Sequence, residues 1–381
     1  MVPTAAQQFD DIRPFYDWEI PDAMRRITAS EAFPLLVSWI FPDRNVKDVR
    51  RTVRSFQTVR DFQTQVMIPV TQQIISHSIT RLTYSGLERL DPAVQYIFLS
   101  NHRDIMLDAA LLQYLLVTHG RESSEITFGA NLMTSGLVTD IGRSNKMFRV
   151  ERGGKMHDFY MSSLHLSAYI RHTLLDKQES VWIAQRNGRT KDGNDKTDQG
   201  IIKMFCMSKP EDKIKALSEL HIIPVSVSYE RESCDILKAI ELYESRYQKY
   251  IKKPGEDLNS IITGIVQQKG QVNFTLCPEI TEEDLLHFDH CTNNEYHKRV
   301  AELIDKRIDS AYKLFVNNYI AHDLRYGKTN YKAFYTDEQL HDFLRHMDKL
   351  NDYDVTEPDI LKDIFLGIYA NPVEKYEHRK I

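Results

Sequence analysis

The stretch YIFLSNHRDIMLDAALLQYLL, residues 96–116, joins a short apolar run to a longer amphipathic one. Residues 96–100 have the length and composition of a buried strand, and the run that follows has the apolar spacing of a helix. A strand that leads directly into a helix is the repeating step of a mostly parallel sheet. His102, Asp104 and Asp108 follow the carboxyl end of this strand, where ligands bind in open α/β sheets.

The same alternation of strand-like and helical runs continues to about residue 280. Further short apolar runs, which we predict to be strands, cover residues 125–129, 147–150, 180–184, 222–229 and 271–276. Helical patterns between them include residues 158–177 and 235–252. This alternation predicts an α/β fold in which a mostly parallel sheet has helices on both faces.

The two ends of the chain lack this alternation. We predict an N-terminal helical region at 1–83, which includes the helical run 62–82, an α/β domain at 84–280 and a C-terminal helical region at 281–381. In the C-terminal region, three threonines each stand three residues before an acidic or amide side chain, which is a pattern of helix N-caps. These threonines are Thr281, Thr336 and Thr356.

The composition is that of a folded protein rather than a disordered or fibrous one. The 381 residues are 42% hydrophobic, carry a net charge of -5 and have a mean hydropathy of -0.44, and the negative charge argues against a general nucleic-acid binder. No apolar run approaches the roughly 18 residues that a membrane-spanning helix needs, and the N-terminus does not resemble a signal peptide, so we expect a cytoplasmic protein. Four cysteines stand far apart without a CxxC pair, so we expect neither a disulfide framework nor a metal site.

Positive charge is concentrated in one segment near the N-terminus. Residues 44–60 contain six arginines and lysines and one aspartate, a local net charge of +5, and they follow a short apolar stretch at 32–41. This segment either docks on an anionic membrane surface or forms an amphipathic helix that covers the core. A second run of basic and tyrosine residues, at 243–253, has helical spacing and predicts a solvated helix face rather than an RNA-binding surface.

Residues 102–104 read HRD, the triplet that opens a protein-kinase catalytic loop. In that loop an asparagine that holds metal follows the aspartate by five residues, but here the position is Ala109. The Gly-rich loop, the VAIK-type lysine and the DFG triplet of kinases are also missing from the sequence. We therefore exclude a protein kinase.

Acyl transfer is a chemistry that fits a histidine followed by a carboxylate at this position. His102 can remove a proton from an attacking hydroxyl group, while an aspartate on the following helix holds the second ring nitrogen and stabilises the imidazolium. The acceptor alcohol itself then attacks a thioester, so the enzyme needs no nucleophilic serine or cysteine. An isolated pair of this kind is more often an ordinary core histidine with its partner, so the interpretation depends on further motifs.

Four segments, taken in order, resemble the four sequence blocks of the glycerophosphate and lysophosphatidate acyltransferase superfamily. They are NHRDIMLD (101–108), MFRVERGG (147–154), VWIAQRNGRTKDG (181–193) and IIPVSVSYE (222–230). The resemblance implies His102 as the general base. The superfamily has its aspartate five residues after the histidine, whereas Asp108 stands six after it and Asp104 two after it. We favour Asp108, which requires one extra residue in the turn or a widened helix, and Asp104 then caps the helix.

The second and third blocks bind the acceptor headgroup in the superfamily. The substrate-binding residues that the resemblance implies are Arg149, Arg152, Gly153, Gln185, Arg186, Asn187, Gly188 and Arg189. Arginine side chains and Gly-rich backbone both suit an anionic group, and we expect the cations to converge at the sheet edge that carries His102. Gln185 stands where the superfamily has glutamate, and residues 191–200 are predicted to form a flexible lid or turn.

The resemblance implies an O-acyltransferase of phospholipid biosynthesis. It would move a fatty acyl group from acyl-carrier protein or coenzyme A to the hydroxyl group of glycerol 3-phosphate or 1-acylglycerol 3-phosphate, without a further cofactor. Because such substrates are amphiphiles, we expect a peripheral protein at the inner face of the membrane. Two alternatives stay open: transfer to another anionic amphiphile, and a non-catalytic lipid-binding or scaffold protein, which the shifted aspartate and Gln185 suggest.

Overall fold

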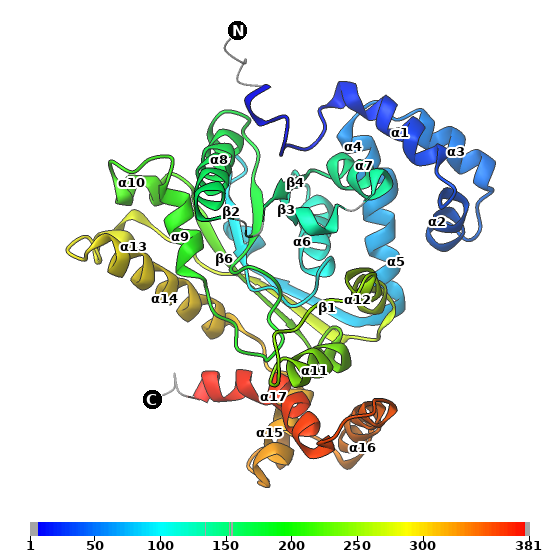
Figure 1. Ribbon diagram of the computed structural model, residues 1–381, viewed down its shortest axis with the longest axis vertical. Helices are drawn as coiled ribbons and strands as arrows, with labels where there is room; N and C mark the ends of the chain where they lie inside the picture. Colours follow the sequence, from blue (N-terminus) through cyan, green and yellow to red (C-terminus); the bar gives the residue numbers. More distant parts are fainter. Residues whose placement is uncertain (1–6, 134, 152, 154, 378–381) are drawn as a thin grey trace.

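A seven-stranded sheet lies at the centre of the molecule, with helices packed on both of its faces (Figure 1). The computed structural model describes residues 7–133, 135–151, 153 and 155–377. The strands are β1 (Ile79–Ser85), β2 (Ile97–Ser100), β3 (Glu125–Gly129), β4 (Met147–Val150), β5 (Val181–Ala184), β6 (Ile222–Tyr229) and β7 (Gly270–Leu276). Their order in the sheet is β1-β7-β6-β2-β5-β3-β4, and all neighbours run parallel except β6 and β7. The predicted α/β fold with a mostly parallel sheet is confirmed.

Strand β2 is buried on both faces, which explains its continuous apolar sequence. Ile97 and Leu99 point into one core cluster, and Phe98 points into the other. Parallel strands that are covered by helices on both sides have this uninterrupted pattern. The carboxyl end of β2 lies at the middle of the sheet, between β6 and β5.

Each face of the sheet has its own set of helices. The face of Ile97 and Leu99 is covered by α8 (Met156–Leu175), α9 (Gln199–Cys206), α10 (Lys213–Ser218), α13 (Glu282–Leu286) and α14 (Asn293–Ala311). The opposite face is covered by α5 (Ile68–Ser78), α6 (Leu107–Thr118), α7 (Gly136–Ser144) and α12 (Glu256–Val266). Helices α13 and α14 follow the boundary predicted at residue 280, yet they complete the core around the sheet.

Two predicted helical runs are wrong at their ends. The run 62–82 ends as a helix at Ser78, and β1 follows it as an edge strand whose half-exposed residues lack a continuous apolar run. The run 235–252 is helical only as α11 (Asp235–Glu244). Residues 245–249 are all exposed, so an extension of α11 through them would bury no apolar face. Helices of about 10–20 residues depend on the packing of an apolar face for their stability.

The N-terminal helices form a small core of their own. They are α1 (Ile20–Ala29), α2 (Phe33–Ile40), α3 (Val46–Arg54) and α4 (Val59–Phe62), and a π-helical segment, Gln63–Met67, continues α4 into α5. Helix α2 buries Phe33 and Val37 in this core but exposes Leu35 and Trp39. No helix among the described residues has the length and apolar character to cross a bilayer.

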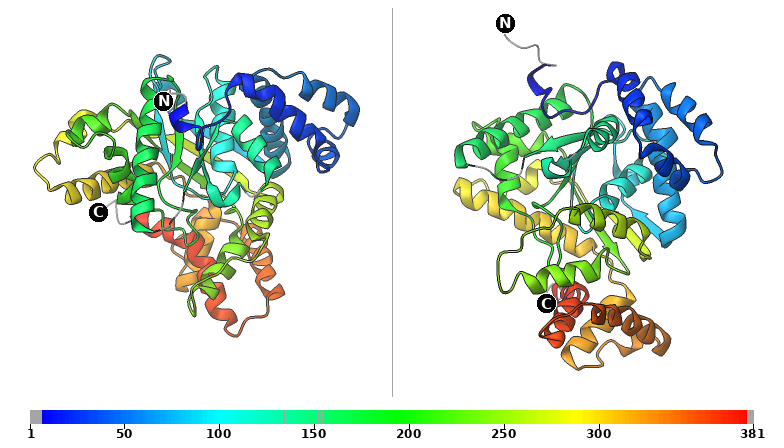
Figure 2. Two further views of the ribbon diagram at one scale, coloured as in Figure 1. Left: turned by 45° about the horizontal axis from the view of Figure 1, so that its top comes forward. Right: turned by 45° about the vertical axis from the view of Figure 1, so that its right-hand side comes forward.

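The C-terminal helices lie together at one end of the molecule (Figure 2). Helices α15 (Val316–Tyr326), α16 (Asp337–Met347) and α17 (Pro358–Glu377) pack with α11 around a separate apolar cluster. Thr281 and Thr336 cap α13 and α16 as predicted, whereas Thr356 lies two residues before α17. Short 3-10 helices at Gln7–Phe9, Asp17–Glu19, Leu87–Arg89, Ala130–Leu132, Lys332–Phe334 and Asp348–Asp352 complete the elements of the described residues.

Candidate active site

His102 and Asp108 form a buried hydrogen-bonded pair at the carboxyl end of β2. Nδ1 of His102 lies 2.9 Å from Oδ2 of Asp108, and Trp182 packs edge-on against the imidazole with 5.7 Å between ring centroids. Because Asp108 occupies Nδ1, Nε2 is the ring nitrogen that is left for a substrate. The pair therefore has the arrangement of a histidine base with an orienting carboxylate.

The carboxylate of Asp108 accepts hydrogen bonds on both of its oxygens. The backbone N–H groups of Arg103 and Asp104 donate to Oδ2 at 2.6 and 2.9 Å, and the Tyr229 hydroxyl donates to Oδ1 at 2.7 Å. Burial raises the pKa of Tyr229 well above its ordinary value, and the negative charge of Asp108 adds to this effect, so the phenol keeps its proton. These contacts fix the orientation of Asp108 and, through it, of His102.

Asp104 has a different role from Asp108. Its Oδ1 accepts the backbone N–H groups of Met106 and Leu107, both at 2.8 Å, at the start of α6. Residues 101–106 form a non-helical turn, and α6 continues from Leu107 as a regular α-helix, so the turn holds the extra residue of the motif. These distances confirm that Asp108 pairs with His102 and that Asp104 caps the helix.

The residues on either side of His102 anchor the turn. Asn101 bridges to β6, since its Oδ1 accepts the Val227 N–H at 2.7 Å and its Nδ2 donates to the Val227 carbonyl at 2.9 Å. Asn101 and Arg103 also both donate to Asp195 Oδ2, at 3.0 and 2.9 Å. Burial alone would lower the pKa of Arg103, but Asp195 and Glu232 raise it well above its ordinary value, so the guanidinium is charged.

Glu232 and Lys238 complete a buried ion cluster with Arg103 and Asp195. Glu232 accepts from Nε and Nη2 of Arg103, with a shortest distance of 2.9 Å. Lys238 Nζ donates to the Glu232 carboxylate at 2.5 Å and to the Arg103 carbonyl at 2.6 Å. The Glu232 N–H donates to the Tyr369 hydroxyl at 3.0 Å, so this cluster connects α17 to the turn of His102.

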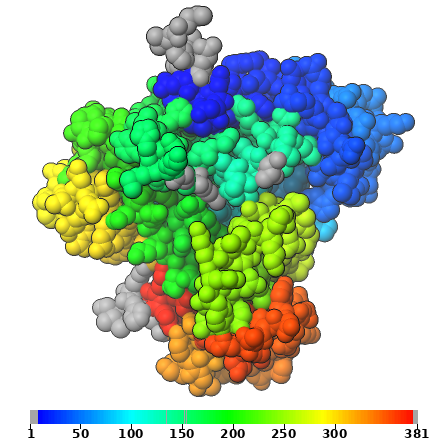
Figure 3. Space-filling view, viewed as in Figure 1, coloured from blue at the N-terminus to red at the C-terminus, as the bar shows by residue number. Residues whose placement is uncertain are grey.

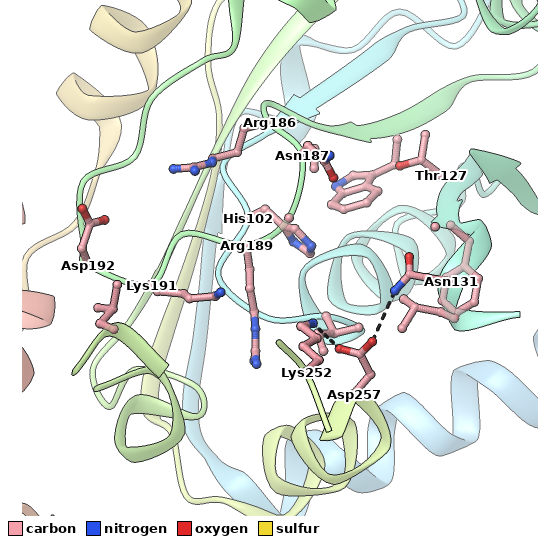
Figure 4. Close-up of a pocket in the computed structure, with 18 residues that line it drawn as sticks. His102, Thr127, Asn131, Arg186, Asn187, Arg189, Lys191, Asp192, Lys252 and Asp257 are labelled. Carbon is pink, nitrogen blue, oxygen red and sulfur yellow. Dashed lines mark hydrogen bonds and ion pairs between the residues drawn. The ribbon is translucent and has the colours of Figure 1, made fainter. Parts of the chain in front are cut away.

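A cavity of 330 Å³ opens beside His102 at the carboxyl ends of β2, β3 and β5 (Figure 4). Thr127 and Asn131 line one side of it, and Arg186 and Arg189 line the other. The cavity thus lies where a parallel sheet of this kind places its ligands.

Four cations among the described residues line this cavity: Arg186, Arg189, Lys191 and Lys252. Lys191 pairs with Glu241, and Lys252 pairs with Asp257. Arg189 donates from Nη2 to Ser260 at 3.0 Å, while its buried Nη1 has no hydrogen-bond partner within the described part of the chain. Arg186 has no ion-pair partner within that part either, so both arginines have N–H groups available for an anion near His102.

A sequence model of the acyltransferase family matches residues 81–228, which contain His102, Asp108 and both arginines of the cavity wall. Residues 81–228 are thus similar to an acyltransferase domain. The resemblance inferred from the four sequence blocks is thereby confirmed at the level of this family. The match does not identify the acyl acceptor or the acyl donor.

Comparisons with individual proteins add little to this acyltransferase assignment. No curated protein sequence matches the chain. Among solved structures, the 1-acyl-sn-glycerophosphate acyltransferase PlsC of Thermotoga maritima is 11% identical, and the alignment covers 76% of this chain and 93% of that one. Its TM-score is 0.34, and we base no conclusion on this similarity.

The second sequence block of the acyltransferase domain does not reach the cavity. Arg149 lies on the edge strand β4, where its side chain forms an ion pair with Glu151 at 2.6 Å. Gly153 does not line the cavity either, while Arg152 and Gly154 lie outside the described residues. The expected convergence of Arg149 with the cations of the third block is therefore wrong.

The third block contributes most of the cationic wall, but two of its predicted features differ. Arg186, Asn187, Gly188 and Arg189 line the cavity, whereas Gln185 is fully buried and does not. The loop 191–200 is not a free lid, because Asp195 and Thr197 are buried in it and hydrogen-bonded to distant parts of the chain. Of the two predicted alternatives, the flexible lid is wrong, whereas a turn agrees with the bends at residues 191–193.

Several residues of the site were not predicted from the sequence. Asp195, Tyr229, Glu232 and Lys238 hold the turn of His102, although Tyr229 does lie within the fourth block. Trp182, Asn131, Lys252 and Asp257 line the cavity. Tyr229 and Trp182 had a usable signal, since both lie on predicted buried strands and within the quoted sequence blocks.

Proposed function

We propose that this acyltransferase moves a fatty acyl group from an acyl thioester to the hydroxyl group of an anionic glycerolipid precursor. The observation that carries the proposal is the His102–Asp108 pair, whose imidazole lines a cavity with unpaired arginine N–H groups. An oriented imidazole suits removal of a proton from a hydroxyl group, and arginine suits phosphate oxygens.

In the proposed step, Nε2 of His102 takes the proton of the acceptor hydroxyl group while its oxygen attacks the thioester carbonyl carbon. Asp108 keeps the proton on Nδ1 and stabilises the imidazolium that forms. When the tetrahedral intermediate collapses, the C–S bond breaks and the thiolate leaves with the proton from Nε2. A new ester and a free thiol result, so atoms and charge balance without a further cofactor.

The cavity wall supplies the groups for the negative charges of this reaction. Arg186 and Arg189 would hold the phosphate of the acceptor by charge-assisted hydrogen bonds. Backbone N–H groups next to Gly188, which has a positive φ of 74° and lines the cavity, would stabilise the oxyanion of the intermediate. Asn187, which is exposed, also lines the cavity beside Gly188.

We propose acyl-carrier protein or coenzyme A thioesters as donors, and glycerol 3-phosphate or 1-acylglycerol 3-phosphate as acceptors. For an acceptor that resides in a bilayer, peripheral docking at the inner face of the membrane fits the reaction. The N-terminal helices offer one such surface, since α2 exposes Leu35 and Trp39 next to the basic helix α3.

The direct test is acyl transfer from labelled acyl-carrier protein and labelled acyl-coenzyme A to a panel of acceptors. The panel contains glycerol 3-phosphate, 1-acylglycerol 3-phosphate and an anionic N-acylated amino acid, with uncharged monoacylglycerol as the control for the anion. We expect ester formation with a phosphate-bearing acceptor and little with monoacylglycerol. Transfer to monoacylglycerol at an equal rate would contradict the role of the arginines. Tight lysolipid binding without any transfer would instead favour the scaffold alternative.

A further inference from the structure

Helix α12 packs Ile265 against the core of the sheet, but three of its large apolar residues are turned outwards. Ser260 and Gly264 are buried, whereas Leu258, Ile262 and Val266 are 61%, 51% and 59% exposed. The three exposed residues are spaced by four, so they form one stripe along the helix. A helix that only covers a core shows the opposite distribution.

The inner face of α12 is fixed by a close approach to the turn of His102. A Cβ atom at position 264 would overlap the Asp104 carboxylate, and Ser260 Oγ accepts the hydrogen bond from Arg189. Small residues are therefore required on this face. The fold gives no comparable reason for three large apolar residues on the outer face, and contiguous exposed apolar surface of this kind marks an interaction site.

The segment before α12 adds exposed cations and two more exposed apolar side chains. Residues 245–255 contain Arg246, Lys249, Lys252 and Lys253 and no acidic residue, so their net charge is +4, in a chain whose net charge is -5. Within the described residues, only Lys252 of the four has an ion-pair partner. Tyr247 and Ile251 are 59% and 82% exposed. This segment is not the solvated helix face predicted from its spacing, because α11 ends at Glu244.

The same segment borders the cavity. Lys252 and Asp257 line it opposite Arg186, and Asn131, in the 3-10 helix that follows β3, donates to Asp257 at 3.3 Å (Figure 4). Figure 3 shows residues 245–266, in yellow-green, uncovered on the face turned to the viewer. The apolar stripe and the unpaired cations thus lie next to the cavity that contains His102.

We propose that residues 245–266 dock the protein on an anionic lipid bilayer, so that an amphiphilic acceptor passes from the lipid surface into the cavity. The passage of an acceptor rests on the proposed function, whereas the docking does not. A membrane-surface helix combines an apolar face with flanking cations, as here. An acidic carrier protein would complement the charge of the cations but would leave the apolar stripe of α12 without an apolar surface to pack against.

Vesicle sedimentation tests the docking without reference to catalysis. The full chain is mixed with phosphatidylcholine vesicles that contain or lack phosphatidylglycerol. We expect Leu258→Glu/Ile262→Glu to weaken binding by about tenfold or more, because two apolar side chains leave the interface and two negative charges enter it. Leu286→Glu on α13 is the matched control, since Leu286 is 53% exposed but lies away from the cavity, and it should bind as the wild type does.

The cations are tested separately with Lys249→Glu/Lys253→Glu. Each lysine near an anionic surface contributes about 1 kcal/mol, so loss of the two should weaken binding to the phosphatidylglycerol vesicles by about 30-fold and have little effect with phosphatidylcholine alone. Lys306→Glu, an exposed lysine on α14, is the control. Unchanged binding in both double variants would overturn the proposal. So would loss of binding only on Leu35→Glu/Trp39→Glu in α2, which would assign docking to the N-terminal helices alone.

Activity measurements then distinguish a lipid surface from a protein donor. With a water-soluble acceptor and no vesicles, Leu258→Glu/Ile262→Glu should retain wild-type turnover with both acyl-carrier protein and coenzyme A donors. A selective rise of KM for the carrier-protein donor would show that this surface binds the acidic carrier protein, and that would overturn the lipid assignment. Absence of transfer in the wild type would refute the proposed function but leave the vesicle result intact.

Discussion

Replacing Glu232 by Gln should strongly destabilise the protein, because it unbalances the buried ion cluster. The positive charges of Arg103 and Lys238 cancel the negative charges of Glu232 and Asp195, and all four side chains are nearly inaccessible to solvent. The substitution keeps the shape but leaves one positive charge without a counter-charge. Removal of one partner from a buried ion pair costs about 3–5 kcal/mol, out of a typical total stability of about 5–15 kcal/mol.

Equilibrium unfolding in urea, followed by circular dichroism, measures this effect. Glu302→Gln is the matched control, because its ion pairs with Lys298 and Arg299 are exposed and should change stability by less than about 1 kcal/mol. The double variant Glu232→Gln/Lys238→Met restores neutrality in the cluster and should be less destabilised than the sum of its single variants by about 1–3 kcal/mol. A cost below about 1 kcal/mol for Glu232→Gln, or strict additivity in the double variant, would refute this reasoning.

The other predictions concern the roles of individual side chains. Asp108→Asn should lower turnover by at least about 100-fold, because an amide does not hold the proton on Nδ1 of His102 as the carboxylate does. Asp104→Ala should cost about 1 kcal/mol of stability through the lost helix cap and should reduce turnover far less. Thermal unfolding measures the stability of both variants, and steady-state kinetics measure their turnover. Arg189→Ala should raise KM for a phosphate-bearing acceptor by about tenfold through loss of a charge-assisted hydrogen bond, while Arg149→Ala should leave KM unchanged. Equal effects of the two variants on KM would mean that the acceptor does not bind at Arg189. Burial alone would raise the pKa of Asp235, but hydrogen bonds from His346 and Tyr369 lower it below its ordinary value. The contribution of Asp235 to stability is therefore present above about pH 4 and is lost as the pH falls further. Asp235→Asn should flatten the stability profile in this acidic range, as urea titrations at several pH values will show.

The central strands of the sheet were predictable because burial on both faces leaves a continuous apolar run. The runs at 125–129, 147–150 and 222–229 coincide with β3, β4 and β6. Strand β1 was missed because it lies at the edge of the sheet, where much of its length is exposed. Its mixture of polar and apolar residues is therefore similar to that of the preceding helix α5. The antiparallel pairing of β6 with β7 was not predicted either, since strand direction leaves no local signature.

The His102–Asp108 pair was predictable because both residues belong to one strand-to-helix unit. The position of Arg149 was not, because it depends on strand order. Strands β5 and β3 lie between β2 and β4, so the end of β4 is three strand spacings, about 14 Å, from the end of β2. Glu232 and Lys238 reach the turn from more than 100 residues away along the chain, and no local pattern links them to Arg103.

The turnover of His102→Ala, measured beside the wild type with the acceptor that the panel identifies, tests the central claim most directly. We predict a loss of about 10²- to 10⁴-fold in kcat, with an unchanged circular dichroism spectrum and unchanged lysolipid binding. A folded His102→Ala protein that transfers acyl groups at the wild-type rate would contradict the assignment of His102 as the general base.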